Sequence, residues 1–178
     1  MPIDYARQTI SYVWVLFVVV WFSAGLTTKP REKSAGTGLR LPLGLIVVAA
    51  VLLFNRRIND SWLSLRLLPN SPWLVFPGLI LTLAGMALAF WARFHLGRNW
   101  GPPATMRVGH ELVTSGPYAY MRHPIYLGAG IALFGTLLAL GNALMALLVP
   151  IVMLRFWWAA RKENQLLVRQ FGEQAERR

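Results

Sequence analysis

Residues 124–157 read PIYLGAGIALFGTLLALGNALMALLVPIVMLRFW, a stretch of about 34 residues with no charged side chain before Arg155. One straight helix of that length would measure about 50 Å, whereas the hydrocarbon core of a bilayer is only about 30 Å thick. The pair Gly141-Asn142, which is typical of turns, lies near the midpoint. The stretch therefore predicts a helical hairpin of two short membrane spans with its tip at Gly141-Asn142.

Three more apolar segments precede this hairpin, at residues 10–26, 39–54 and 72–91, and each approaches the length of a membrane-spanning helix. Pro72 suits the first turn of the third segment. Residues 55–71 mix arginines with apolar side chains and are expected to lie along the membrane surface. Small residues on the third segment and the hairpin provide faces for close helix packing; they are Gly78, Ala84, Gly85, Ala89, Gly128, Gly130, Ala132 and Gly135.

The composition agrees with a membrane protein. Of the 178 residues, 56% are hydrophobic and 14% are charged, so the chain is more apolar than a soluble domain of this size. The first segment contains bulky aromatic residues and no small-x-small cleavage site follows it, so we expect a retained helix rather than a signal peptide. The sequence thus predicts an all-α integral membrane protein of one domain with about five transmembrane segments. The last two form the short hairpin, and a cytosolic C-terminal helix follows them.

The net charge of +11 comes from basic residues that lie between and beyond the apolar segments. Positive charge in these places sets membrane topology and attracts anionic headgroups, so we expect membrane lipids as partners and no nucleic acid. The positive-inside rule places the polar region at 93–123 and the C-terminus in the cytosol, in a membrane of the bacterial inner-membrane type. The chain has no cysteine, and no ligand spacing links its three histidines, so no metal site is expected.

Residues 110–129, HELVTSGPYAYMRHPIYLGA, are polar where the neighbouring segments are apolar. Gly116-Pro117 predicts a turn at which the backbone can approach a ligand closely. Arg122-His123-Pro124 begins the next helix, where free N–H groups attract an anionic group. With the three tyrosines of the stretch, these features suit a ligand that has an aromatic base and a charged end. Taken singly, each tyrosine is also explained as an interface anchor.

The pattern Gly116-Pro117-Tyr118-x-Tyr120-x-Arg122-His123-Pro124-x-Tyr126-x-Gly128 resembles the signature of the isoprenylcysteine carboxyl methyltransferases and related phospholipid methyltransferases. Two further patterns resemble the same family: Leu96-Gly97-x-Asn99-Trp100, and Glu163 followed eight and nine residues later by Phe171-Gly172. The resemblance covers residues 91–173. It implies an integral membrane enzyme that transfers a methyl group from S-adenosylmethionine to a lipophilic small molecule or a lipidated substrate. Residues 1–92 would then form three N-terminal spans, and residues 93–178 the cofactor-binding catalytic half of a single domain, 1–178.

The resemblance also implies roles for individual residues. The catalytic residues would be Arg122, Glu163 and Asn164, with Arg122 orienting a carboxylate. A larger set of residues would bind the cofactor, by lining its adenine side, forming the pocket wall or holding its polar end. They are His110, Leu112, Val113, Gly116, Tyr118, His123, Pro124, Tyr126 and Glu163. An ordinary carboxylate on an amphipathic helix is the alternative interpretation of Glu163.

The chain departs from the family pattern in its tail. Asn164 stands where the family usually has a second glutamate, and Ala175 where it usually has a tyrosine. Because of these departures, the sequence supports the binding of S-adenosylmethionine more strongly than it supports prenylcysteine as the methyl acceptor. A carboxylate acceptor is already ionised at neutral pH, whereas an amine or thiol would need a base. Two alternatives stay open: an NADPH-dependent reductase of the membrane sterol or enone type, and a non-catalytic membrane scaffold with a decayed site.

Overall fold

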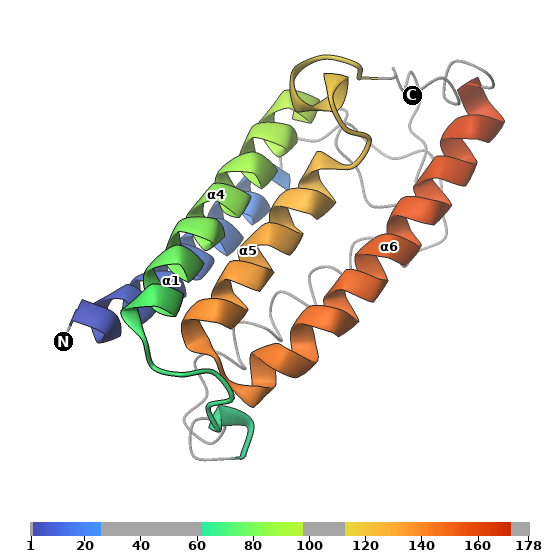
Figure 1. Ribbon diagram of the computed structural model, residues 1–178. Helices are drawn as coiled ribbons and strands as arrows, with labels where there is room; N and C mark the ends of the chain where they lie inside the picture. The colour runs from blue at the N-terminus through green and yellow to red at the C-terminus, as the bar shows by residue number, and fades with distance from the viewer. Residues whose placement is uncertain (1, 26–61, 98–112, 172–178) are drawn as a thin grey trace.

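The computed structural model describes residues 2–25, 62–97 and 113–171 (Figure 1). Within these ranges the regular elements are all helical, which confirms the predicted all-α class. They are α1 (Pro2–Gly25), the short 3-10 helix η1 (Trp62–Ser64), α4 (Pro72–Leu96), the 3-10 helix η3 (Gly116–Ala119), α5 (Pro124–Leu140) and α6 (Ala143–Phe171).

Three of these helices are long and apolar enough to cross a membrane: Ile3–Trp21, Pro72–Leu96 and Ala143–Gln165, while Pro124–Leu140 is a shorter apolar helix. Residues 10–25 of the first predicted segment fall on α1, and the segment 72–91 falls on α4. Pro72 begins α4, and the Ser71 side chain caps it by accepting a hydrogen bond from the Trp73 backbone N–H. The predicted second segment, 39–54, lies outside the described residues. The chain is an integral membrane protein, and the candidate spans found among its described residues are the three helices named above.

The hairpin tip lies where the sequence predicts it. Gly141 ends α5 with a left-handed backbone at φ 60°, and its N–H donates to the carbonyl of Leu137 at 2.7 Å. The side chain of Asn142 then accepts a hydrogen bond from the Met145 N–H at 3.0 Å and so caps α6. Residues 65–68 bind the tip through the backbone, with Leu67 N–H donating to the Gly141 carbonyl at 2.7 Å.

The second arm of the hairpin is longer than predicted. The sequence suggested a short span followed by a separate C-terminal helix, but α6 runs without interruption over 29 residues, from Ala143 to Phe171. The predicted C-terminal helix is therefore not confirmed as an element of its own, because its residues continue α6. Residues 151–171 contain no glycine or proline that would break the helix. The polar residues that follow the apolar part are mostly good helix formers such as arginine, lysine and glutamate, so the backbone hydrogen bonds of the helix continue through them. Pro150 is accommodated inside the helix.

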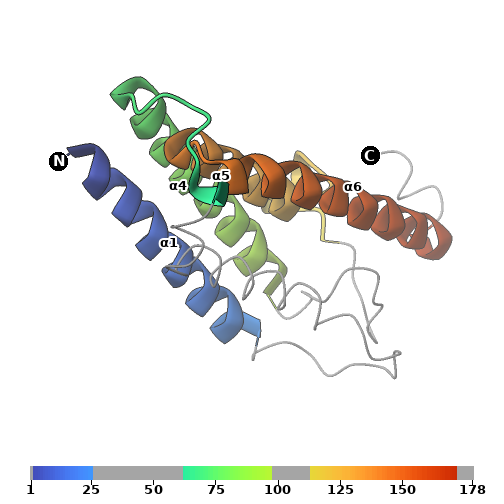
Figure 2. The same cartoon turned by 90° about the horizontal axis from the view of Figure 1, so that it is seen from below.

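The helices pack in the order α1, α4, α5, α6, with the antiparallel α4–α5 pair in the middle, as Figures 1 and 2 show. Glycines bring α4 and α5 into backbone contact. A Cβ atom added at Gly85 would lie 2.4 Å from the backbone N of Ala132, and one at Gly78 would lie 2.6 Å from the carbonyl oxygen of Gly135. The predicted small-residue packing is thus confirmed for these positions, whereas Ala84 is exposed.

A buried threonine pair joins α4 to α5 and reaches α1. The Thr82 and Thr136 hydroxyls lie 3.3 Å apart, and the Trp14 indole N–H of α1 donates to Thr136 at 3.0 Å. Because α4 and α5 are antiparallel and closely packed, the end of α4, η3 and the start of α5 lie at one end of the bundle. The last turns of α6 reach the same end (Figure 1).

Candidate active site

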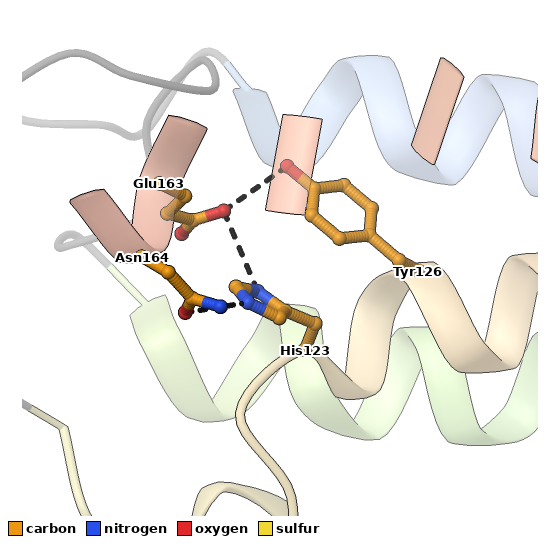
Figure 3. A network of polar contacts seen from close by, with 4 residues as sticks. All are labelled: His123, Tyr126, Glu163 and Asn164. Carbon is orange, nitrogen blue, oxygen red and sulfur yellow. Dashed lines mark hydrogen bonds and ion pairs between the residues drawn. The ribbon is translucent and has the colours of Figure 1, made fainter. Parts of the chain in front are cut away.

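Four polar side chains from two helices converge where α5 begins. His123 precedes the first residue of α5, Tyr126 lies in its first turn, and Glu163 and Asn164 project from α6 (Figure 3). Pro124 fixes the start of α5 and is buried. His123 occupies the N-cap position without capping the helix through its side chain, so its ring is directed to α6.

The contacts between these side chains form one network. His123 Nε2 lies 3.0 Å from Asn164 Oδ1, and the Tyr126 hydroxyl donates to Glu163 Oε2 at 3.1 Å. The same carboxylate oxygen lies 3.6 Å from His123 Nδ1. The roles at the 3.0 Å contact depend on the His123 tautomer. When Nε2 carries the proton it donates to Asn164 Oδ1, and when Nδ1 carries it, Nε2 accepts a hydrogen bond from the Asn164 amide turned to present its NH₂ group.

Aromatic rings form one side of this network. The His123 and Tyr126 rings stack with centroids 5.5 Å apart, and Tyr126 stacks on Phe156 at 5.4 Å. The side chain of Glu163 is 40% exposed, while that of His123 is 17% exposed. A carboxylate that is accessible beside a row of ring faces attracts a cation, because both the negative charge and the ring quadrupoles favour it.

The 3-10 helix η3 brings Tyr118 towards this cluster. Burial raises the pKa of the Tyr118 hydroxyl well above its usual value, the charge of Glu163 raises it further, and Arg93 opposes the rise. The hydroxyl therefore stays protonated at neutral pH and can act as a hydrogen-bond donor. Arg93 itself is only 2% exposed, and it donates a hydrogen bond to the carbonyl of Gly97 at 3.1 Å.

The turn before η3 rests on a second histidine. His95 Nε2 lies 2.8 Å from the Ser115 hydroxyl, and Gly116 has a backbone φ of 58°. A Cβ atom added at Gly116 would lie 2.7 Å from the His95 ring. Glycine is required here both by the left-handed backbone and by the close approach of the ring.

We expect Gly116→Ala to destabilise the fold by about 1–2 kcal/mol from the left-handed backbone alone, with a further cost from the His95 ring. The expected result is a lower midpoint of thermal unfolding in detergent. A double-mutant cycle separates the two causes: in a His95→Ala background, the same substitution should cost less. An equal cost in both backgrounds would contradict the contact with the ring.

The structure brings some predicted site residues together and separates others. His123, Tyr126, Glu163 and Asn164 form the network, and the charge of Glu163 raises the pKa of the Tyr118 hydroxyl. Arg122 is exposed just before His123, and Val113 is half-buried at the start of the described segment. The predicted residues His110 and Leu112 lie outside the described residues.

Three contributors were given no role by the sequence reasoning: Arg93, His95 and Phe156. Arg93 had a usable signal, because a charged residue at the end of a long apolar helix is costly and generally has a specific use. His95 and Phe156 carried no comparable signal, since their value depends on the residues that the fold places beside them.

Comparison with known proteins finds a family match in the half of the chain that contains this site. The model of the isoprenylcysteine carboxyl methyltransferase family matches residues 78–169, just over half of the chain. The matched range runs from α4 through the site to the last turn of α6.

Individual relatives carry the corresponding name. The protein-S-isoprenylcysteine O-methyltransferase of Rattus norvegicus is 31% identical over 125 residues, which are 65% of this chain and 44% of the relative. That of Schizosaccharomyces pombe is 43% identical over 68 residues, 38% of this chain and 29% of the relative. Protein-S-isoprenylcysteine O-methyltransferase B of Arabidopsis thaliana is 25% identical over 171 residues, 92% of this chain and 82% of the relative. The chain therefore spans less than half the length of the mammalian relatives that it matches.

Proposed function

Because the chain belongs to the isoprenylcysteine carboxyl methyltransferase family, we propose that it transfers a methyl group from S-adenosylmethionine to a lipophilic acceptor at the membrane surface. The observation that carries this proposal is the network of His123, Tyr126, Glu163 and Asn164 at the end of the bundle. A partly exposed carboxylate beside stacked rings suits a ligand that combines a cationic centre with a flat base.

Methyl transfer requires few catalytic groups from the protein. S-adenosylmethionine supplies an electrophilic methyl group on a sulfonium, so the side chains need only bind, align and exclude water. In our proposal Glu163 and His123 hold the polar end, Tyr126 and Tyr118 contribute donors and ring faces, and Gly116 and Pro124 shape the wall. His110, Leu112 and Val113 complete the adenine side.

For the acceptor, we propose a lipid-soluble carboxylate. The relatives named above methylate S-isoprenylcysteine by name, and a carboxylate needs no general base at neutral pH. Arg122 and Asn164 are the residues that we assign to the acceptor end. Arg122 is exposed beside the network, and the neutral amide of Asn164 spares an anionic acceptor the repulsion of a second acidic side chain.

The membrane arrangement is also part of the proposal. We propose five membrane segments, consisting of α1, the apolar residues 39–54, α4, α5 and the apolar part of α6. The domain 1–178 would then have three N-terminal spans within residues 1–92 and its catalytic half in residues 93–178. The excess of basic residues in 93–123 and in the tail favours a cytosolic site and a cytosolic C-terminal part of α6, in a bacterial-type inner membrane.

Calorimetric titration into the detergent-purified protein tests the cofactor, with S-adenosylmethionine as ligand and NADPH as control. We expect S-adenosylmethionine to bind and NADPH not to bind. A second assay offers a small S-prenylated cysteine and radiolabelled cofactor, with the methyl ester of the same acceptor as control, because the ester has no free carboxylate. NADPH binding would favour the reductase alternative, and cofactor binding without transfer to the free acid would reject this acceptor.

We expect Glu163→Gln to lower the rate of methyl transfer by about 10- to 100-fold, the effect of losing one or two charge-assisted contacts. The amide keeps the size of the side chain but removes its negative charge, so the fold should be retained. Asp4→Asn is the matched control, because it makes the same chemical change at the first turn of α1. Full activity in Glu163→Gln would show that α6 does not contribute this carboxylate to the site.

A further inference from the structure

The outward face of α6 changes its chemical character along the helix. Ile151 and Leu154 are exposed and apolar, with Leu154 62% exposed. Trp157 and Trp158 follow and are 47% and 56% exposed. Beyond them come two exposed cations, Arg161 and Lys162. The order on this face is therefore aliphatic, then aromatic, then cationic.

Each cation is held against one of the tryptophans. Arg161 Cζ lies 3.7 Å from the ring centroid of Trp157, and Lys162 Nζ lies 5.2 Å from that of Trp158. Residues four apart share a helix face, so the two pairs lie side by side. A guanidinium that stacks on a ring keeps its N–H edge available to an anionic oxygen, and an ammonium keeps its donors.

These cations are not neutralised by acidic side chains in the part of the chain that the structure describes, where neither forms an ion pair with a carboxylate. Glu163 is their neighbour in sequence, but its carboxylate contacts Tyr126 and His123 on the inward side of the helix. The outward face at this level therefore carries a net positive charge.

The sequence of chemistries along the face matches one leaflet of a bilayer. Aliphatic residues suit acyl chains, tryptophans concentrate at the interface, and cations meet the headgroup phosphates. The distance also fits, since α6 rises about 28 Å from Ala143 to Lys162 and a hydrocarbon core is about 30 Å thick.

We propose that Trp157, Trp158, Arg161 and Lys162 form a binding surface for an anionic phospholipid, whose phosphate lies between the two cations. Because Glu163 and Asn164 follow directly in the same helical turn, a lipid bound here holds the His123 network at the level of the headgroups. This proposal requires only that α6 lies in a membrane, so it does not depend on methyl transfer.

The test uses the absence of native cysteine. Leu154→Cys carries a bimane fluorophore, and the full chain is reconstituted in phosphatidylcholine vesicles that contain a small fraction of dibrominated phosphatidylglycerol or dibrominated phosphatidylcholine. Brominated chains quench bimane only when they lie beside it. We expect phosphatidylglycerol to quench as though it were enriched at least about fivefold over the bulk, because one surface cation supplies about that factor and this surface has two.

Charge variants then show whether the enrichment is local. Arg161→Gln with Lys162→Gln should return the ratio to about one, provided that its thermal midpoint shows a folded protein. Lys29→Gln with Arg31→Gln removes the same charge from residues 27–38 and should leave the ratio unchanged. A wild-type ratio near one, or the same enrichment in the first double variant, would overturn the proposal. An equal fall of the ratio in the Lys29→Gln, Arg31→Gln variant would also overturn it. So would a bimane group that neither brominated lipid quenches, because protein would then cover this face.

Discussion

His123→Ala should lower the affinity for S-adenosylmethionine by about 100-fold or more while leaving the fold intact. The ring contacts Asn164 at 3.0 Å, lies 3.6 Å from Glu163 and stacks on Tyr126, so its removal takes away the central member of the network. A hydrogen bond to a charged group contributes about 1.5–3 kcal/mol. In our proposal His123 makes one such bond to the cofactor and orients Glu163 for a second, so the loss of both accounts for a fall of this size. The measurement is calorimetric titration of the cofactor into purified variant and wild type.

Two controls make the result specific. The midpoint of thermal unfolding should change by only a few degrees, because the His123 side chain is partly exposed and lies outside the α4–α5 interface. His123→Gln keeps a polar atom within reach of Asn164 and should restore part of the affinity. Binding of His123→Ala within a factor of two of the wild type would reject the assignment of the site.

The largest effect on the fold is expected from Gly85→Leu. At this position the backbone of α4 meets the backbone of α5, and even a Cβ atom would lie 2.4 Å from Ala132 N and 2.5 Å from the carbonyl of Gly128. Overpacking in well-packed cores costs about 1–3 kcal/mol when side chains can shift, and here the backbones themselves must separate. We therefore expect a fall in the thermal midpoint on the order of 10 °C or failure to purify as a folded protein.

Ala84→Leu is the matched control for this variant. It introduces the same side chain at the neighbouring position, which is exposed. Its thermal midpoint should stay within a few degrees of the wild type, since surface substitutions usually change stability by less than about 0.5 kcal/mol. Equal midpoints for Gly85→Leu and wild type would show that α4 and α5 are not in backbone contact.

These two expectations are linked by geometry. The close approach of α4 and α5 fixes where α5 begins relative to the last turn of α4, and the hairpin then directs α6 back to the same end. A variant that separates the first pair should also displace His123 from Glu163. Loss of cofactor affinity in Gly85→Leu would thus follow from the scaffold, whereas in His123→Ala it would follow from the site.

Several features of this protein were determined by sequence alone. The apolar runs predict membrane helices because hydrocarbon offers no hydrogen-bond partners, and a helix satisfies its backbone groups within a single segment. Gly141-Asn142 predicts the hairpin tip, since a left-handed glycine ends one helix and an asparagine caps the next. The local signature around His123 was also sufficient to indicate the family, which the comparison with known proteins supports.

Other features were decided only by the tertiary structure. Whether α6 stops after its apolar part could not be read from composition, because a helix continues wherever its residues favour the ladder and no breaker intervenes. The partners in the network are 41 residues apart for His123 and Asn164 and 37 for Tyr126 and Glu163. No local rule connects such distant positions. Their meeting depends on the angle at which α6 leaves the hairpin and on how closely glycines let α4 and α5 approach, which are properties of packing between helices rather than of any one segment.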